Sequence, residues 1–196
     1  MKLRIALAQV NPTVGDLAAN AALVRENFKT AQEAGAHIVV FPEMVLTGYP
    51  VEDLALRPSF QIASQNALAE LAKSLTGKSV AIVGYLDQVD GAPQNMVAVI
   101  SDGVVSARYA KCHLPNYGVF DEFRNFVPGD KTLVVRIHGV DVGIAICEDL
   151  WIDGGITSQL ADRKPGLVIV PNGSPYERNK DDVRLELVSK RARQAS

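Results

Sequence analysis

A run of β-branched and small apolar residues that ends in a cysteine and two acids constrains this chain more than any other stretch. The run covers residues 140–146, and Cys147, Glu148 and Asp149 follow it directly. It predicts a buried strand, and the abrupt change to polar residues marks the edge of a sheet, where an enzyme can place a nucleophile. The alternative is that Cys147 only finishes the strand, since unpaired cysteine is among the most buried residue types.

Strand and helix patterns alternate on either side of this run and predict an α/β fold. The expected strands and hairpin arms cover residues 3–9, 37–41, 79–85, 96–101, 104–109, 133–137, 140–146 and 166–170. Helices are expected after the N-caps Asp16 and Ser59, over residues 156–162, and from Asp181 onward. The irregular segment 114–128 is rich in aromatic and polar residues, so we expect it to line a pocket.

Composition restricts the partners that this chain can have. A length of 196 residues with 47% apolar residues suits a single domain with a substantial core, and a net charge of −2 offers no basic patch for nucleic acid or anionic lipid. No apolar run is long enough to cross a membrane and no signal peptide is evident, so we expect a cytoplasmic protein. The two cysteines, Cys112 and Cys147, form neither a disulfide framework nor a zinc motif.

Three expected strands end in residues that can carry chemistry: Glu43, Lys111 and Cys147. Ligands gather beyond the carboxyl ends of such strands, so the three side chains can converge on one site. Glu43 can take the thiol proton, and Lys111 can stabilise a thiolate or the oxyanion of a tetrahedral intermediate. Considered singly, Glu43 could also be a turn residue and Lys111 a solvated charge.

Two other residues compete for roles in this chemistry. Cys112 is a second candidate nucleophile, although it does not end a long buried strand. His113 could form a Cys–His dyad with Cys147, but sequence spacing neither supports nor excludes a pair that forms only in space.

Three segments, taken in order, resemble the catalytic triad of the nitrilase (carbon–nitrogen hydrolase) superfamily: Phe41-Pro42-Glu43, Lys111 at a hairpin exit, and Cys147-Glu148-Asp149. Within the superfamily, the whole chain resembles the N-terminal glutaminase domain of glutamine-dependent NAD+ synthetases. The most specific stretch is the Pro-Asn-Tyr-Gly-Val-Phe-Asp-Glu run at 115–122. The resemblance implies a nitrilase-like αββα sandwich that is incomplete at its C-terminal end.

The resemblance also implies a role for each residue of the triad. Cys147 would attack the side-chain amide of glutamine, Glu43 would serve as general base and acid, and Lys111 would stabilise the oxyanion. The implied substrate-binding positions are Tyr117, Ser174, Lys180, Glu148, Tyr49 and Trp151. No metal site and no cofactor is implied for these 196 residues.

The partners implied by the resemblance are L-glutamine and a C-terminal synthetase domain of the same chain. That domain would use ATP and Mg²⁺ to amidate nicotinic acid adenine dinucleotide with the released ammonia, and a homo-oligomer is expected. Its Ser-Gly-Gly-x-Asp-Ser loop is not present, so we expect residues 1–196 to be a truncated carbon–nitrogen hydrolase (glutamine amidotransferase) domain. The alternatives are a stand-alone amidase for another small amide and a catalytically silent interaction module.

Overall fold

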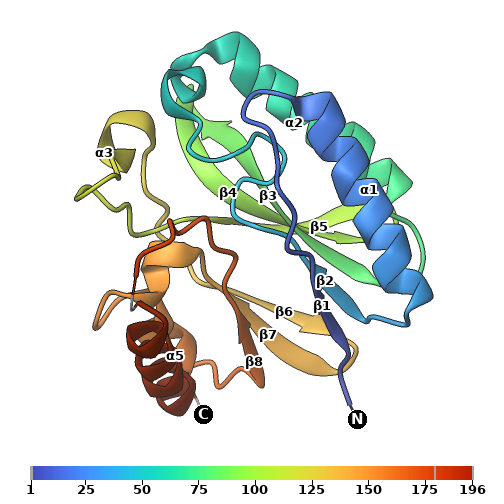
Figure 1. Ribbon diagram of the computed structural model, residues 1–196. Helices are drawn as coiled ribbons and strands as arrows, with labels where there is room; N and C mark the ends of the chain where they lie inside the picture. Colours follow the sequence, from blue (N-terminus) through green and yellow to red (C-terminus); the bar gives the residue numbers. More distant parts are fainter. Residues whose placement is uncertain (1, 179, 196) are drawn as a thin grey trace.

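Two β-sheets pack face to face in the computed structural model, which describes residues 2–178 and 180–195 (Figure 1). The first sheet has the order β1 (Ile5–Leu7), β2 (Ile38–Val40), β3 (Val80–Val89), β4 (Ala92–Ser101) and β5 (Val104–Ala110). β1, β2 and β3 are parallel, and β4 and β5 follow as antiparallel hairpin strands. The second sheet has the order β6 (Leu133–Ile137), β7 (Val140–Ile144) and β8 (Leu167–Ile169).

Helices cover the outer side of each sheet and complete an αββα arrangement (Figure 1). α1 (Leu17–Glu33) and α2 (Pro58–Ser74) pack on the five-stranded sheet, and α4 (Ile156–Ala161) and α5 (Lys180–Ala195) lie on the side of the three-stranded sheet. The short elements are η1 (Glu52–Leu56), α3 (Glu122–Asn125) and η2 (Cys147–Leu150). The expected fold class is therefore confirmed, and the expected irregular segment 114–128 contains only the short α3.

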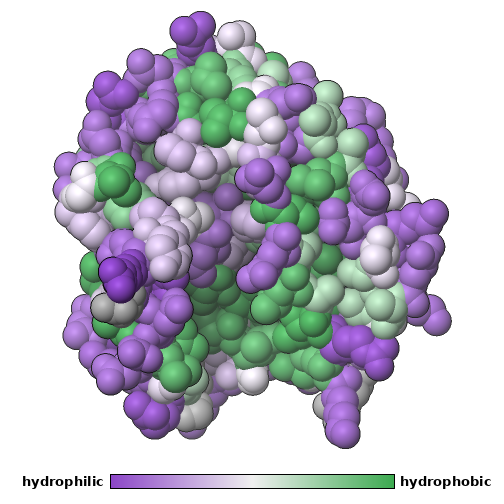
Figure 2. Space-filling view, viewed as in Figure 1, coloured by the Kyte–Doolittle hydropathy of each residue, from purple (hydrophilic) through white to green (hydrophobic). Residues whose placement is uncertain are grey.

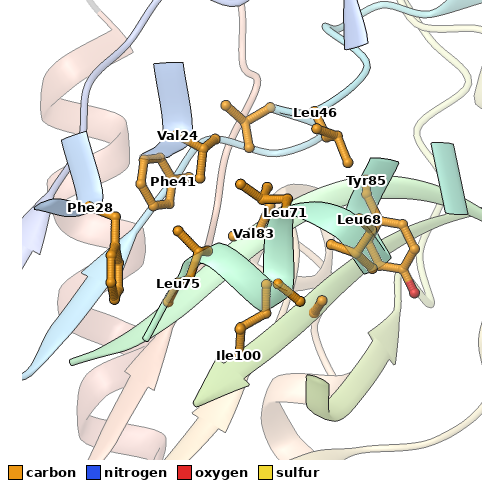
Figure 3. Close-up of a cluster of buried hydrophobic side chains, with 14 of the residues drawn as sticks. Val24, Phe28, Phe41, Leu46, Leu68, Leu71, Leu75, Val83, Tyr85 and Ile100 are labelled. Carbon is orange, nitrogen blue, oxygen red and sulfur yellow. The ribbon is translucent and has the colours of Figure 1, made fainter. Parts of the chain in front are cut away.

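The period-two alternation of strand side chains builds a separate apolar layer on each face of the first sheet. In β2, Val39 points toward α1 and α2, whereas Ile38 and Val40 pack against the second sheet. Figure 3 shows the helix-side layer, in which Phe28 of α1 and Leu71 of α2 meet strand residues. Because both faces are covered, the central strands read as continuous apolar runs.

A third apolar cluster supports the turn that carries Glu43. Met44 and Leu86 pack there with Leu114 and Phe126. Gly84 of β3 allows this turn to approach closely, because a Cβ at that position would lie 2.2 Å from the backbone N of Met44. The cluster thus joins the turn after β2 to the loop that leads into and out of α3.

The structure differs from the sequence-based expectation at three places. Ser59 does not cap α2, because the helix begins at Pro58, whose fixed φ and missing N–H suit the first helical position. An Asp90-Gly91 turn joins β3 to a longer β4, and both turn residues have the positive φ that such a hairpin needs. β7 ends at Ile144, so Cys147 opens η2 instead of ending the strand directly.

An apolar groove with a volume of about 510 Å³ lies between β8 and α5. Figure 2 shows the apolar surface of this hollow, which includes Leu167, Val168 and Val170 on one side and Val188 on the other. It lies beside the site described below, not within it.

No helix in the described part of the chain is long and apolar enough to cross a membrane.

Candidate active site

Glu43, Lys111 and Cys147 meet at one edge of the two-sheet core, although Glu43 and Cys147 are 104 positions apart in the sequence. Glu43 lies in the turn after β2, Lys111 follows β5 directly, and Cys147 opens η2 after β7. Lys111 Nζ donates to Glu43 Oε1 at 2.8 Å. All three residues are at most 3% exposed, so the structure brings together the three groups in a site shielded from bulk water.

A second carboxylate, Glu122 of α3, completes the ion cluster around Lys111. Lys111 Nζ lies 3.0 Å from one carboxylate oxygen of Glu122 and 2.9 Å from the other, and the Tyr49 hydroxyl donates to Glu122 Oε1 at 3.0 Å. One ammonium group therefore faces two buried carboxylates. Glu122 ends the Pro-Asn-Tyr-Gly-Val-Phe-Asp-Glu run, but no role was predicted for it from the sequence.

Burial and neighbouring charges together raise the pKa values of both Lys111 and Glu122. Burial by itself would lower the pKa of Lys111, but attraction to Glu43 and Glu122 raises that pKa above its ordinary value, so Lys111 stays protonated. Burial raises the pKa of Glu122, and the negative charge of Glu43 raises it further, while the Lys111 ammonium lowers it. The cluster therefore keeps its cation and makes the second carboxylate ready to hold a proton.

Cys147 has a strained backbone and a protonated thiol. Its φ of 42° lies in the left-handed region, which a residue with a side chain adopts at a cost and which is frequent at active sites. Its N–H donates to Pro171 O at 3.0 Å, and its Sγ lies 3.4 Å from Ser174 Oγ. Burial raises the pKa of Cys147 to about 12 and the Glu43 charge adds to this, although Lys111, Ser174 and the Gly173 N–H oppose it. Because the resting thiol is protonated, attack requires a base.

The Glu43 carboxylate is held by three donors from three segments. Lys111 Nζ and Asn95 Nδ2 both donate to Oε1 at 2.8 Å. The Gly173 N–H donates to Oε2 at 2.8 Å. The Gly173 N–H that binds Oε2 also lies near the Cys147 thiol, whose pKa it lowers.

Asp149 ties the segment after β5 to the segment before η2. One of its oxygens accepts from the N–H groups of Cys112 and His113 at 3.1 and 2.8 Å. The other accepts from the Tyr109 hydroxyl at 2.7 Å and from the Ile146 N–H at 2.9 Å. The side chain of Asp149 is fully buried, so these bonds replace its hydration and fix the spacing between the lysine and the thiol.

The two competing candidates, His113 and Cys112, are engaged elsewhere. His113 Nδ1 lies 3.0 Å from Asp149 Oδ1, while the hydrogen-bond partner of the Cys147 thiol within the described residues is Ser174. Cys112 Sγ donates to the carbonyl of Ala110 at 3.4 Å, and burial raises its pKa to about 11. A dyad of His113 with Cys147 is therefore not formed.

The residues predicted from the sequence to bind substrate fall into two groups, one close to the catalytic cluster and one farther from it. Tyr117 donates to Glu148 Oε2 at 2.8 Å, which puts a half-exposed phenol against a buried carboxylate next to the nucleophile. Ser174 and Tyr49 contact the cluster directly, as described above. Lys180 lies farther out, with its Nζ 5.5 Å from the ring centroid of Trp151 and paired with Glu177.

The acidic side chains of the site are not grouped as metal ligands. Over the described ranges 2–178 and 180–195, no group of three or more His, Cys, Asp and Glu side chains is arranged to hold a metal ion. The carboxylates at the site face the Lys111 ammonium instead.

Comparison with known proteins decides the family. The model of the carbon-nitrogen hydrolase family matches residues 4–194. The chain belongs to the carbon–nitrogen hydrolase family. A solved amidase from Nesterenkonia sp. shares the fold with a TM-score of 0.81 at 24% identity, covering 97% of this chain and 71% of that one.

Relatives of this carbon–nitrogen hydrolase include much longer proteins. A glutamine-dependent NAD(+) synthetase from Xylella fastidiosa is 44% identical over 98% of this chain and 35% of its own length. The structure of glutamine-dependent NAD+ synthetase from Acinetobacter baumannii has a TM-score of 0.93 at 37% identity, over 98% of this chain and 36% of that chain. The chain thus spans about a third of the length of these synthetases.

Three site residues of this carbon–nitrogen hydrolase were not assigned from the sequence: Glu122, Asn95 and Asp149. Glu122 and Asp149 stand inside the segments that carry the family resemblance, so their position in those segments was the available signal. Asn95 follows Gln94 just before the expected apolar strand 96–101, and nothing in the sequence distinguishes it from a surface amide.

Proposed function

We propose that this chain hydrolyses the side-chain amide of glutamine and forms the glutaminase part of a glutamine-dependent NAD+ synthetase. The observation that carries the proposal is the buried meeting of Glu43, Lys111 and Cys147 in a chain that is similar over nearly its whole length to synthetases named for their use of glutamine. A thiol, a base and a fixed cation are the groups that acyl transfer from an amide requires.

In the acylation step, Glu43 Oε2 takes the proton of Cys147 as Sγ forms a bond to the amide carbon. The carbonyl oxygen becomes an oxyanion, which the Lys111 ammonium stabilises. The N–H of Glu148 is a second donor, because it lies in the first turn of η2, where an N–H has no acceptor within the helix. Glu43 then gives the proton to the amide nitrogen, and the C–N bond breaks. Ammonia departs, and a glutamyl thioester remains on Cys147.

In the deacylation step, a water molecule attacks the thioester carbon while Glu43 takes one of its protons. The tetrahedral oxyanion again lies against Lys111. As the C–S bond breaks, the sulfur leaves and recovers the proton from Glu43, which regenerates the resting thiol. Glutamate is the second product, so the cycle consumes one water and returns every group to its starting protonation state.

Glutamine carries an ammonium and a carboxylate at its other end, and both need partners at the pocket mouth. The buried Glu148 carboxylate, oriented by Tyr117, suits the ammonium. Ser174 and Lys180 offer a hydroxyl and a cation for the carboxylate, and Tyr49 and Trp151 supply aromatic walls. We therefore propose that the residues predicted from the sequence to bind substrate hold the two charged groups of glutamine.

In the synthetase proposed here, the ammonia amidates nicotinic acid adenine dinucleotide in a C-terminal domain of the same protein, with ATP and Mg²⁺ bound there. A homo-oligomer and a cytoplasmic location remain predictions.

Ammonia release tests the substrate directly. The protein is expected to release ammonia from glutamine at least 100-fold faster, as kcat/KM, than from asparagine or simple aliphatic amides, because those lack either the chain length or the zwitterionic end. Hydrolysis of aliphatic amides with none of glutamine would favour a stand-alone amidase, the function suggested by the Nesterenkonia neighbour. Hydrolysis of neither would favour the silent interaction module.

A further inference from the structure

Asn95 contacts two members of the triad from the middle of the fold. It lies near the start of β4 and is 1% exposed. Its side-chain Nδ2 donates to Glu43 Oε1 at 2.8 Å, and its backbone carbonyl accepts the N–H of Lys111 at 2.9 Å. In the described part of the chain, Lys111 is the other side chain that hydrogen-bonds to that carboxylate, so Asn95 is a specific partner of Glu43.

The amide of Asn95 is only half satisfied. Its Oδ1 is buried and has no hydrogen-bond partner among the described residues. A flipped amide would set this oxygen against Glu43 Oε1, so the donating orientation is the one that the carboxylate dictates. A leucine of similar size would avoid the cost of an orphaned polar atom. What an apolar residue could not supply at this position is the N–H that reaches Glu43.

The donors on Glu43 are distributed unevenly between its two oxygens. Among the described residues, Oε1 accepts from Lys111 and Asn95, whereas Oε2 accepts from the backbone N–H of Gly173 alone. An oxygen that already accepts two short hydrogen bonds is the poorer acceptor for a third proton. We propose that Asn95 is a positioning residue that keeps Oε1 of Glu43 occupied and so directs the proton of Cys147 to Oε2. This inference rests on the proposed role of Glu43 as the general base.

Other charged or titratable groups surround the same carboxylate, and a test has to separate Asn95 from them. Lys111 follows β5, Glu122 comes from α3, Tyr49 from the loop before η1, and Cys147 from η2. None of these is changed by a substitution in β4. Gln94, the preceding residue of β4, is also buried, but its side chain reaches the carbonyl of Pro128 instead of Glu43.

The test compares Asn95→Leu with the matched control Gln94→Ala. In Asn95→Leu the ionised form of Glu43 loses one donor, so we expect the acidic limb of the pH profile of kcat/KM for glutamine to move to higher pH. The plateau should fall roughly 10- to 100-fold, the range seen when a side chain that orients a metal-ligating residue is lost. Gln94→Ala should leave the limb where it is in the wild-type protein, and Asn95→Ala should repeat the shift if leucine does not fit.

A second readout keeps this inference separate from the choice of substrate. The rate at which iodoacetamide alkylates Cys147 also depends on the transfer of its proton to Glu43, and it needs no glutamine. In Asn95→Leu and Asn95→Ala, the acidic limb of the pH profile of the alkylation rate is expected to move to higher pH in the same way. If the wild-type protein hydrolyses no glutamine, the proposed substrate is wrong and the alkylation profile alone decides the role of Asn95. An unmoved limb in a folded Asn95 variant would overturn the inference.

Discussion

Replacing Cys147 with alanine is expected to abolish amide hydrolysis while the protein stays folded. The substitution removes the atom that forms the thioester, and loss of a nucleophile in covalent catalysis lowers kcat by roughly 10⁴- to 10⁶-fold. The sulfur is buried, so its removal leaves a small cavity that costs about 1 kcal/mol of unfolding free energy. Ammonia release and urea unfolding, measured on the same preparation, check both parts of this expectation.

Cys112→Ala is the matched control for that substitution. Its thiol donates to a backbone carbonyl and lies outside the cluster of Glu43 and Lys111, so we expect at most a few-fold change in kcat. Substantial ammonia release by Cys147→Ala, together with its loss in Cys112→Ala, would transfer the nucleophile to Cys112.

Replacing Lys111 with methionine is expected to damage both activity and stability. Loss of the oxyanion donor should lower kcat on the order of 10³-fold, at the upper end for a single donor, because the same cation also positions Glu43. The carboxylates of Glu43 and Glu122 are then left in the interior without their cation. Removing one partner of such a buried cluster typically costs about 3–5 kcal/mol of unfolding free energy at neutral pH.

The stability loss of Lys111→Met should depend on pH with a defined sign. The pKa of Glu122 is already raised in the folded protein to about 7, so its stabilising contribution is complete below the ordinary carboxyl range near 4.5 and is lost as pH rises through the folded value. Near pH 5 Glu122 is protonated and needs no cation, whereas above pH 7 its buried charge lacks the Lys111 ammonium in the variant. The loss of unfolding free energy in Lys111→Met should therefore be smaller near pH 5 and larger above pH 7. Urea unfolding at both pH values measures it, and an equal deficit at both would show that Glu122 does not carry the excess charge.

Lys29→Met is the control for the unfolding measurements on Lys111→Met at both pH values. The ammonium of Lys29 is exposed and lies 3.9 Å from Glu33 in α1, so its loss should change the unfolding free energy by no more than about 0.5 kcal/mol. A similar loss of stability in Lys29→Met and Lys111→Met would contradict the buried ion cluster.

The sequence predicted the positions of Glu43, Lys111 and Cys147 because each follows a strand whose pattern is visible in the residues themselves. The strands before Glu43 and Cys147 read as apolar runs with sharp ends, whereas the half-exposed β5 before Lys111 was predicted as the second arm of a hairpin. The hairpin with the expected arms 96–101 and 104–109 was predictable because the two residues between the arms, Asp102 and Gly103, both accept a positive φ. The family resemblance then added the αββα arrangement, which the sheets confirm.

What the sequence did not predict depends on packing between distant segments. Glu122 reaches Lys111 only because the loop around α3 packs on the cluster of Met44 and Leu86. Asn95 has a role only because β4 lies beside the turn of Glu43. The hairpin at Asp90-Gly91 was missed because polar residues flank the turn and interrupt the apolar alternation. Backbone pairing, not an apolar face, defines that end of β3 and β4.

Labelling with a chloroketone analogue of glutamine tests the central claim most directly. The reagent carries the zwitterionic end of the substrate and places an electrophilic carbon where the amide carbon would lie. Peptide mass spectrometry is expected to find one label per chain, on Cys147, with glutamine slowing the labelling and ammonia release falling in proportion to it. Full labelling of Cys147 with undiminished ammonia release, or loss of activity through a label on Cys112, would contradict the account.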